Sequence, residues 1–244
     1  MSTRRVIVTG GASGIGAATV ARFAADGAVG VALDRTPVEG LPDGWTSATV
    51  DVTDDAAVAA AFASALEILG GLDVLVAAAG IVPPWQPTGT LSLEDYDRTM
   101  AVNVRGVVAA IEQSAPALRS GGAIVVVGSL NSWRGDPNLT AYAASKHAVL
   151  GVVRSAALSL GPRGVRVNAV APGPVATEAL RARVAARVET SGGDAAEAFA
   201  ALAAGTALGR IATVDDVVDA IAFLAGPGSA ATTGHLLPVD GGIA

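Results

Sequence analysis

The feature that most constrains the fold of this chain is a repeated alternation of short apolar runs with longer segments of helical spacing. Each apolar run is nearly continuous, which is typical of a parallel strand that is covered on both faces. The order predicts an α/β fold built on a doubly wound parallel sheet of about seven strands with helices on both faces. The strand-like runs cover residues 6–8, 29–33, 48–50, 74–76, 123–127, 165–170 and 235–239, and the helical segments cover 12–26, 56–69, 93–118, 142–160 and 214–224.

No linker, low-complexity tract or internal repeat divides the sequence, so we expect a single domain over residues 1–244. One segment departs from the pattern of strands and helices. Residues 178–208 are rich in alanine and arginine and contain no strand-like run. This segment has two interpretations, a helical flap over a substrate site or a plain helical insertion at the surface. We adopt the substrate flap as the working hypothesis.

The charge and composition argue against several classes of partner. The net charge is −6, whereas proteins that bind nucleic acid or anionic membrane surfaces carry basic patches. The chain has no cysteine and two histidines, so disulfides and cysteine-ligated metals are impossible and we expect no metal site. No apolar window reaches the roughly 20 residues that span a bilayer, and the first residues lack the pattern of a signal peptide. We therefore expect a cytoplasmic protein.

A glycine-rich turn follows the first apolar run. The sequence Thr9-Gly10-Gly11-Ala12-Ser13-Gly14-Ile15-Gly16 separates that run from a helical segment. Strand, glycine turn and helix in this order are the setting in which such a motif binds a dinucleotide. Glycine lets the backbone approach a ligand closely, and the amides at the helix N-terminus face the pyrophosphate. The alternative is a tight turn that binds no ligand. The predicted phosphate-binding residues are Gly10, Ser13, Gly14, Ile15 and Gly16.

The second apolar run leads into Asp34. A carboxylate at this point can accept hydrogen bonds from both hydroxyls of the adenosine ribose, and it would repel a 2′-phosphate. We therefore predict NAD as the cofactor, with NADP as the less favoured alternative. The neighbouring Arg35 keeps that alternative open, because a guanidinium can pair with a phosphate. It can equally stack on adenine or lie in solvent.

Tyr142 and Lys146 form the candidate chemical group. They stand at positions i and i+4 at the start of a helical segment, so their side chains share one helix face. A nearby ammonium favours the phenolate and lowers the tyrosine pKa, which is about 10 in the absence of neighbours. The pair therefore predicts a group that exchanges a proton near neutral pH. A packed tyrosine beside a surface lysine is the alternative for this motif taken alone.

Together these motifs resemble those of the short-chain dehydrogenase/reductase family, whose fold is Rossmann-like, and the resemblance extends from about Arg5 to the C-terminus. The combination of several motifs in the family's order is far more specific than any one of them. Besides the glycine turn, Tyr142 and Lys146, the matching residues are Asp51-Val52, Asn103 within Ala101-Val102-Asn103-Val104, Ser129 thirteen residues before Tyr142, the segment from Asn168 to Thr177, and Val239-Asp240-Gly241-Gly242.

The resemblance implies a catalytic tetrad of Asn103, Ser129, Tyr142 and Lys146. Tyr142 would exchange a proton with the substrate oxygen, and Ser129 would hydrogen-bond the same oxygen. Lys146 would bind the nicotinamide ribose and depress the tyrosine pKa, and Asn103 would hold a water in a proton relay. The resemblance also implies cofactor contacts from Asp51 and Val52 at the adenine, from Ala78 and Gly80, and from Pro172, Gly173, Val175 and Thr177 near the nicotinamide.

Three segments of the chain depart from the family pattern. The family usually has Asn-Asn-Ala-Gly where this chain has Ala77-Ala78-Ala79-Gly80, so two amide side chains that could brace neighbouring backbone are absent. Gly128 replaces a serine that often precedes the catalytic one. Reductases of the family that act on acyl-carrier-protein substrates with NADP usually place a basic residue in the glycine turn, where this chain has Ser13. The last departure argues against that assignment.

Two tryptophans are expected near the substrate. Trp85 follows the fourth apolar run and Trp133 follows Ser129, and ligands of open α/β sheets bind at these strand ends. The alternative for each is a packed loop aromatic or an interface residue. Asn131 adds a polar contact or lies in a solvated loop. The predicted substrate is a small or medium secondary alcohol or ketone. Its predicted contacts are Trp85, Asn131, Trp133 and Pro174, and Arg134 and His147 are weaker candidates for meeting a carboxylate.

The helical segment after Tyr142 is apolar or small on nearly every face over residues 148–158. Such a helix is buried on all sides, so we expect one side to pack on the sheet and the other on a second subunit. The family resemblance implies a homotetramer.

The sequence thus predicts an NAD-dependent alcohol dehydrogenase or carbonyl reductase, in which the cofactor carries the hydride and the protein supplies position and proton transfer. Three alternatives stay open: an NADP-linked 3-oxoacyl-type reductase, a non-redox epimerase or dehydratase on the same scaffold, and a regulatory module that binds the cofactor without catalysis. The last would predict loss of Tyr142 or Lys146, and both are present.

Overall fold

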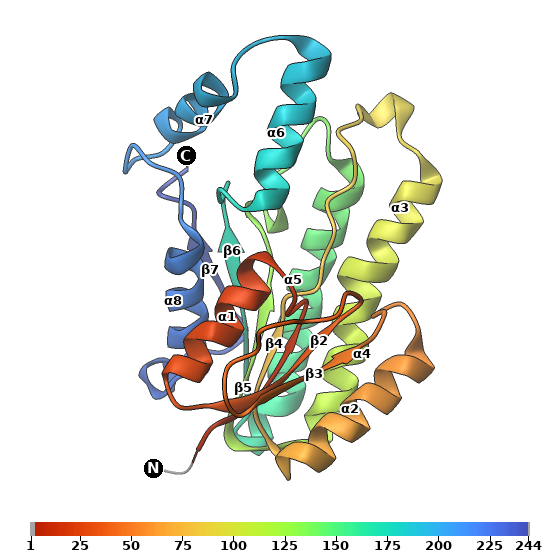
Figure 1. The fold of residues 1–244 in the computed structure, drawn as a ribbon, viewed down its shortest axis with the longest axis vertical. Coiled ribbons are helices and arrows are strands. Elements are labelled where there is room, and N and C mark those ends of the chain that lie inside the picture. Colours follow the sequence, from red (N-terminus) through yellow and green to blue (C-terminus); the bar gives the residue numbers. More distant parts are fainter. Residues whose placement is uncertain (1–2, 244) are drawn as a thin grey trace.

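The strands form one parallel sheet in the order β3-β2-β1-β4-β5-β6-β7 (Figure 1). The computed structural model describes residues 3–243, and within this range the sheet has the seven strands expected from the sequence. The order reverses between β1 and β4, which creates the crevice where ligands of doubly wound sheets bind. The strands are β1 (Arg5–Thr9), β2 (Val29–Asp34), β3 (Trp45–Thr49), β4 (Leu72–Ala77), β5 (Leu118–Val127), β6 (Arg166–Pro172) and β7 (Leu236–Val239).

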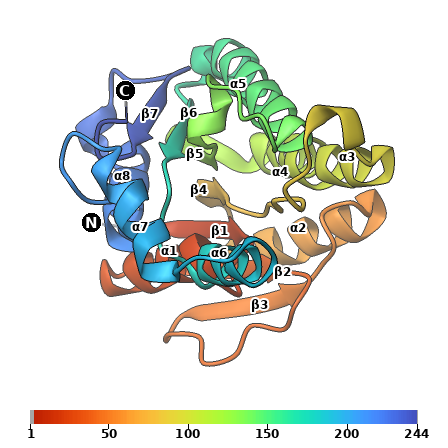
Figure 2. The same ribbon diagram turned by 90° about the horizontal axis from the view of Figure 1, so that it is seen from above.

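Helices cover both faces of the sheet (Figure 2). One face is covered by α1 (Gly14–Ala25) and α8 (Val214–Ala225), and the other by α2 (Asp55–Leu69), α4 (Gly106–Ser114) and α5 (Thr140–Leu160). Among the described residues, no helix is both long and apolar enough to cross a membrane. The remaining helices are α3 (Leu93–Met100), α6 (Glu178–Ser191) and α7 (Ala195–Ala204).

The continuous apolar runs follow from this two-sided cover. Successive side chains of a strand point to opposite faces. In β1, Val6 and Val8 pack into the cluster beneath α1 and α8, while Ile7 packs into the cluster beneath α2, α4 and α5. All three side chains are fully buried. A strand with polar residues on alternate positions would place them in one of these cores, so the central strands are apolar throughout.

The helical segment expected over residues 93–118 is helical from Leu93 to Ala117, with a change of helix type inside it. Within it, α3 is followed by a π-helical turn (Ala101–Arg105), and α4 ends at Ser114. Pro116 follows in a short 3-10 turn, and β5 begins at Leu118. Proline lacks the backbone donor and disfavours helical geometry in the residue before it, which accounts for the end of α4. The strand expected at 48–50 lies earlier, as β3, and is partly exposed at the edge of the sheet.

The segment between β6 and α8 is helical, as α6 and α7. Figure 1 shows these two helices extending beyond the end of the sheet at which the strands finish. The same end carries the glycine turn after β1 and the loops after β4 and β5. The chain is therefore folded so that α6 lies at the end of the sheet where we expect the active site.

Candidate active site and cofactor crevice

The glycine turn joins the end of β1 to the start of α1. Gly10 donates its amide to the Leu33 carbonyl at 2.7 Å, which fixes the turn against β2. Helix α1 begins at Gly14 with Ser13 as its N-cap, and among the described residues no side chain caps the free amides of its first turn. Free amides at a helix N-terminus carry a partial positive charge and bind anions. The predicted phosphate residues therefore surround an open helix N-terminus.

The turn has the shape of a cradle that any side chain would fill. Gly10 has a φ of 74°, and a Cβ there would lie 2.6 Å from the Ala79 nitrogen. A Cβ on Gly16 would lie only 1.9 Å from the carbonyl oxygen of Gly10. Gly14 has a φ of 52°. These positions require glycine because the backbone of the turn, the helix and the loop after β4 approach one another closely. The donor set and the shape fit a dinucleotide pyrophosphate.

Asp34 is the last residue of β2 and lies beside the glycine turn at the edge of the crevice. Its Oδ2 accepts a hydrogen bond from the Ala12 amide at 3.0 Å, and its Oδ1 accepts one from the Thr36 amide at 2.9 Å. The carboxylate is half-buried beside the glycine turn. This is the place predicted for an acid that meets an adenosine ribose. The structure also gives Asp34 a second role, since it ties the turn to the loop after β2.

Asp51 and Val52 follow β3 at the same end of the sheet. Hydrogen bonds from the Thr53 backbone and side chain lower the pKa of Asp51, although burial opposes them, and the charge of Arg35 adds to the effect. Val52 packs closely against Gly106. A Cβ at Gly106 would lie only 2.8 Å from the Cγ2 atom of Val52. Arg35 is exposed and close enough to Asp51 to act on it, so its charge is partly balanced within the protein.

The loop after β4 lacks the two asparagines usual in the family, and main-chain contacts support it instead. The Ala78 amide donates to the Thr9 carbonyl at 3.1 Å, and the Ala79 amide donates to the Thr9 hydroxyl at 3.4 Å. Gly80 then passes beside the tetrad, because a Cβ there would lie 3.3 Å from Oδ1 of Asn103 and 3.7 Å from Nζ of Lys146. The loop is thus held against β1.

The segment after β6 forms the far wall of the crevice. Pro172 and Val175 are buried, and Gly173 donates its amide to the Val239 carbonyl at 3.0 Å. Thr177 is the N-cap of α6 and accepts a hydrogen bond from the Leu180 amide. A Cβ on Gly14 would lie 4.0 Å from Cγ2 of Thr177. The residues predicted to hold the nicotinamide therefore lie across from the helix predicted to hold the phosphates.

Tyr142 and Lys146 occupy the first turns of α5, on the face that points into the crevice. Nζ of Lys146 lies 5.6 Å from the centre of the Tyr142 ring and donates a hydrogen bond of 2.8 Å to the carbonyl of Val127 at the end of β5. The side chain is only 5% exposed, and burial lowers its pKa to about 8. Lys146 is also the only lysine in the sequence. The alternative of a surface lysine is therefore wrong.

Burial is the largest influence on the pKa of Tyr142 in this structure, and the effect expected from Lys146 stays a prediction. Burial raises the pKa of Tyr142 above its ordinary value, and the groups that oppose this rise are the hydrogen bond with Ser129 and the charge of Arg183. The free-energy cost of removing a phenolate from water is larger than the stabilisation of the phenolate by Ser129 and Arg183. Tyr142 is thus a neutral phenol at pH 7 and is suited to donate a proton.

Asn103 lies within the π-helical turn and is fully buried. Its Oδ1 accepts from the Ile81 amide at 2.8 Å, and its Nδ2 donates to the Ile81 carbonyl at 2.9 Å and to the Ser145 hydroxyl at 3.1 Å. The Ser145 hydroxyl donates in turn to the Tyr142 carbonyl at 2.7 Å. The side chain of Asn103 therefore joins the loop after β4 to the first turn of α5. Ser145 was not anticipated from the sequence.

Ser129 is positioned by the short turn that follows β5. Its hydroxyl accepts the Asn131 amide at 3.1 Å, and its own amide donates to the Ser132 hydroxyl at 3.2 Å. Because that oxygen already accepts a bond, its hydrogen is left to donate toward Tyr142 or a substrate oxygen. Ser132 is buried and braces the turn, and Asn131 is half-buried.

The two tryptophans differ in their surroundings. Trp85 is half-buried and lies beneath two arginines of α6: the guanidinium carbons of Arg183 and Arg187 are 4.6 Å and 5.1 Å from its ring centre. Trp133 is 40% exposed. His147 is exposed, and its Nδ1 shares a hydrogen bond with the Ala143 carbonyl of its own helix. The sequence did not single out Arg183, although the arginine content of this segment and the spacing of its arginines were visible.

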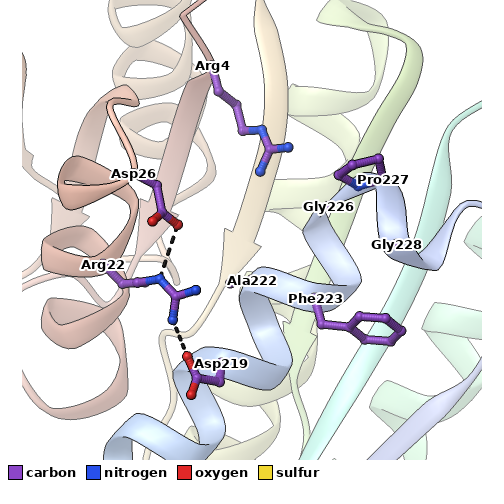
Figure 3. Close-up of a pocket in the computed structure, with 9 residues that line it drawn as sticks. All are labelled: Arg4, Arg22, Asp26, Asp219, Ala222, Phe223, Gly226, Pro227 and Gly228. Carbon is purple, nitrogen blue, oxygen red and sulfur yellow. Dashed lines mark hydrogen bonds and ion pairs between the residues drawn. The ribbon is translucent and has the colours of Figure 1, made fainter.

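A separate hollow of about 460 Å³ lies at the opposite end of the sheet (Figure 3). Arg4, which directly precedes β1, lines it, so the hollow is at the amino ends of the strands. Arg22 of α1 forms ion pairs there with Asp26, at 3.1 Å, and with Asp219 of α8. This hollow is therefore distinct from the site around Tyr142, both in its position and in the ion pairs that line it.

Comparison with known proteins agrees with this geometry. The family model described as enoyl-(acyl carrier protein) reductase matches residues 10–244. The (−)-isopiperitenol/(−)-carveol dehydrogenase, mitochondrial, of Mentha piperita is 39% identical over 97% of this chain and 92% of its own. The cis-4-hydroxycyclohexanecarboxylate dehydrogenase of Sinomonas cyclohexanicum is 37% identical over 98% of this chain and 96% of its own.

Solved structures match over nearly the whole chain as well. NAD⁺-bound xylitol dehydrogenase has a TM-score of 0.88 and 27% identity, covering 98% of both chains. ElxO with NADP bound has a TM-score of 0.88 and 26% identity, again covering 98% of both chains. Similar structures thus hold either cofactor.

Proposed function

Because this chain belongs to the short-chain dehydrogenase/reductase family, we propose that it oxidises a small or medium secondary alcohol with NAD, or reduces the matching ketone with NADH. The observation that carries this proposal is the grouping of Tyr142, Ser129 and Lys146 at the crevice of the sheet. A proton donor, a hydrogen-bond donor and a buried ammonium lie close together there.

In reduction, Tyr142 donates its proton to the substrate oxygen, and Ser129 donates a hydrogen bond to the same oxygen as negative charge develops on it. The raised pKa of Tyr142 keeps the phenol protonated for this step. Lys146 spends one donor on Val127 and has its remaining donors available for ribose hydroxyls. NAD(H), when bound, supplies or accepts the hydride.

NAD is the proposed cofactor because of Asp34. Its carboxylate lies beside the glycine turn, bonded to the Ala12 and Thr36 amides, so a 2′-phosphate would meet a fixed negative charge. The phosphates would be held by the residues from Gly10 to Gly16, the adenine by Asp51 and Val52, and the nicotinamide by the segment from Pro172 to Thr177.

The proposed substrate is a secondary alcohol or ketone that contacts Trp85, Asn131, Trp133 and Pro174, with α6 and α7 acting as the flap. Two relatives are named for compounds with hydroxyl groups, carveol and hydroxycyclohexanecarboxylate, which supports an alcohol as the substrate class. We further propose a homotetramer, the assembly that the family resemblance implies. Val108 of α4 and Leu158 of α5 are 43% and 82% exposed on one face of the sheet, which supports contact with a second subunit there.

The test is absorbance in the reduced-nicotinamide band, with NAD and with NADP, over a panel of ring-borne and open-chain secondary alcohols and the matching ketones. We expect turnover with some of these compounds, higher kcat/KM with NAD than with NADP, and none in Tyr142→Phe. An enzyme that changes this band with no compound and neither cofactor is not the proposed oxidoreductase. A higher kcat/KM with NADP would retain the reaction class but reject the cofactor assignment.

A further inference from the structure

Arg183 places a guanidinium from α6 beside the candidate active site. Its guanidinium carbon lies 4.6 Å from the centre of the Trp85 ring, and Trp85 belongs to the loop that leaves β4. The side chain is half-buried, whereas Arg187, one helical turn later, stacks on the same ring but is exposed. The two arginines therefore share one aromatic partner and differ in their access to the interior.

One donor of Arg183 is left without a protein acceptor. Its Nη2 atom is buried and has no hydrogen-bond partner among the described residues. A buried donor without an acceptor is unfavourable and rare in native structures, so it calls for a partner such as a ligand, ion or water. Stacking on Trp85 occupies a face of the guanidinium and gives no acceptor to the N–H groups, which point outward in the plane of the group. The N–H groups of this buried atom are therefore left unsatisfied by the protein.

The positive charge of Arg183 acts on Tyr142, the proposed proton donor. Its positive charge is close enough to Tyr142 to lower the pKa of that phenol. Burial lowers the pKa of Arg183 itself, while the charge of Asp136, and that of Tyr142 in its ionised form, oppose that shift. Asp136 acts through its charge, and its Oδ1 accepts a hydrogen bond from the Asn138 amide at 2.8 Å. The cation is therefore only partly balanced within the protein.

We propose that Arg183 is a specificity residue that binds a carboxylate of the substrate, so that the enzyme acts on secondary alcohols or ketones that carry a carboxylate. This inference rests on the proposed function and narrows its substrate class. A planar guanidinium matches the geometry of a carboxylate, and the charge-assisted bond gives the buried Nη2 its acceptor. A carboxylate fits better than a phosphate dianion, because Asp136 already contributes a negative charge near Arg183.

The test compares Arg183→Met with Arg187→Met. Both variants lose an arginine that stacks on Trp85, so Arg187→Met controls for weakened support of α6. Each enzyme is assayed with NAD on hydroxycyclohexanecarboxylates and open-chain hydroxy acids, each paired with its neutral carboxamide. We expect Arg183→Met to lower the kcat/KM ratio of acid to amide by about 10- to 100-fold, the equivalent of one charge-assisted hydrogen bond. Arg187→Met should leave this ratio unchanged, and Arg183→Lys should restore part of it.

Two results would overturn the inference while leaving the proposed function intact: equal turnover of acids and amides by the wild type, or an equal loss on both in Arg183→Met. A second measurement does not depend on turnover. Cyclohexanecarboxylate should raise the melting temperature of the wild-type and Tyr142→Phe complexes with NADH, and should fail to raise that of Arg183→Met. If no compound is oxidised or reduced, this binding test still decides the role of Arg183; absence of a shift in the wild type rejects it.

Discussion

The ammonium of Lys146 lies 5.6 Å from the centre of the Tyr142 ring and is fixed by a 2.8 Å hydrogen bond to the Val127 carbonyl. Val127 ends β5, and Tyr142 and Lys146 both belong to α5. The end of a strand of the sheet therefore fixes the position of the ammonium relative to the tyrosine ring. This contact positions Lys146 by a strand end rather than by a mobile loop. The predictions below follow from this arrangement and from the crevice beside it.

Replacing Tyr142 by phenylalanine removes the proton donor and keeps the ring. We expect kcat for the oxidation of the best alcohol to fall about a hundredfold to ten-thousandfold, the range for losing a general acid or base. The affinity for NADH, measured by fluorescence titration, should change little, because the glycine turn is distant from the hydroxyl. Substantial turnover in Tyr142→Phe would show that another group transfers the proton.

The pH profile of alcohol oxidation should rise toward alkaline pH. Tyr142 must accept a proton in this direction, and burial raises its pKa, so the active base form grows as pH increases. Ser129 opposes this shift through its hydrogen bond, so Ser129→Ala should move the rising limb of log kcat/KM to higher pH as well as lower its plateau. A limb that stays in place in Ser129→Ala would contradict the assigned contact.

Lys146 allows a direct titration because the sequence contains no other lysine. Carbon-13-labelled lysine should give one Cε signal, with a midpoint near the pKa of about 8. Since the pKa is lowered on folding, the unfolded chain holds the proton more tightly above pH 8. The free energy of unfolding should then rise with pH by on the order of 2 kcal/mol up to about pH 9.5.

The control for this titration is Lys146→Met, in which that rise should disappear. Measurements stop near pH 9.5 because tyrosines begin to ionise at about pH 10. A midpoint close to the ordinary lysine value would mean that the ammonium is not buried as the structure describes.

Gly16 is a sharp test of the cofactor cradle. A Cβ at this position would lie 1.9 Å from the Gly10 carbonyl oxygen, whereas nothing lies within 4 Å of a Cβ at Gly89. Overpacking of this kind costs about 1–3 kcal/mol, so Gly16→Ala should weaken NADH binding about tenfold or more or destabilise the fold. Gly89→Ala should do neither. Calorimetric titration with NADH and thermal unfolding separate these effects. Wild-type affinity together with wild-type stability in Gly16→Ala would contradict the close approach of Gly16 to Gly10.

Asp34 should determine the choice between NAD and NADP. In Asp34→Ala the ratio of kcat/KM with NAD to that with NADP should fall about 10- to 100-fold, which corresponds to roughly 1.4–2.8 kcal/mol of lost discrimination. The two oxygens of Asp34 also accept the Ala12 and Thr36 amides, and Asp34→Asn removes the charge while keeping an acceptor for one of these amides. It should reduce the ratio to a similar extent. Full discrimination in both variants would reject electrostatic repulsion as the cause.

Much of the fold could be predicted because its signals are local. The glycine turn, the end of β2 at Asp34 and the start of the helix near Tyr142 each depend on a few consecutive residues whose backbone preferences agree with the fold. The π-helical turn between α3 and α4 could not be predicted in this way. It contains Asn103, whose side chain bonds Ile81 and Ser145, residues that are distant from it in the sequence.

Less of the site than of the fold could be predicted, because the site depends more on contacts between residues that are distant in the sequence. The spacing of Tyr142 and Lys146 predicts their proximity, but the sign of the Tyr142 pKa shift depends on how deeply the folded chain buries the phenol. Arg183 is one of several arginines in its segment. Only its packing on Trp85 and its buried Nη2 atom distinguish it, and both require the contact between α6 and the loop after β4.

The burial of the single lysine determines how the protein reacts with amine-directed reagents. Apart from the α-amine of the chain, Lys146 is the one primary amine in the sequence, and it is buried. Reagents that acylate amines therefore find no side-chain target on the outside of the molecule. Cross-linkers that join lysines will leave neighbouring subunits unlinked even when these are assembled, and arginine- or carboxylate-directed reagents are needed to capture an oligomer.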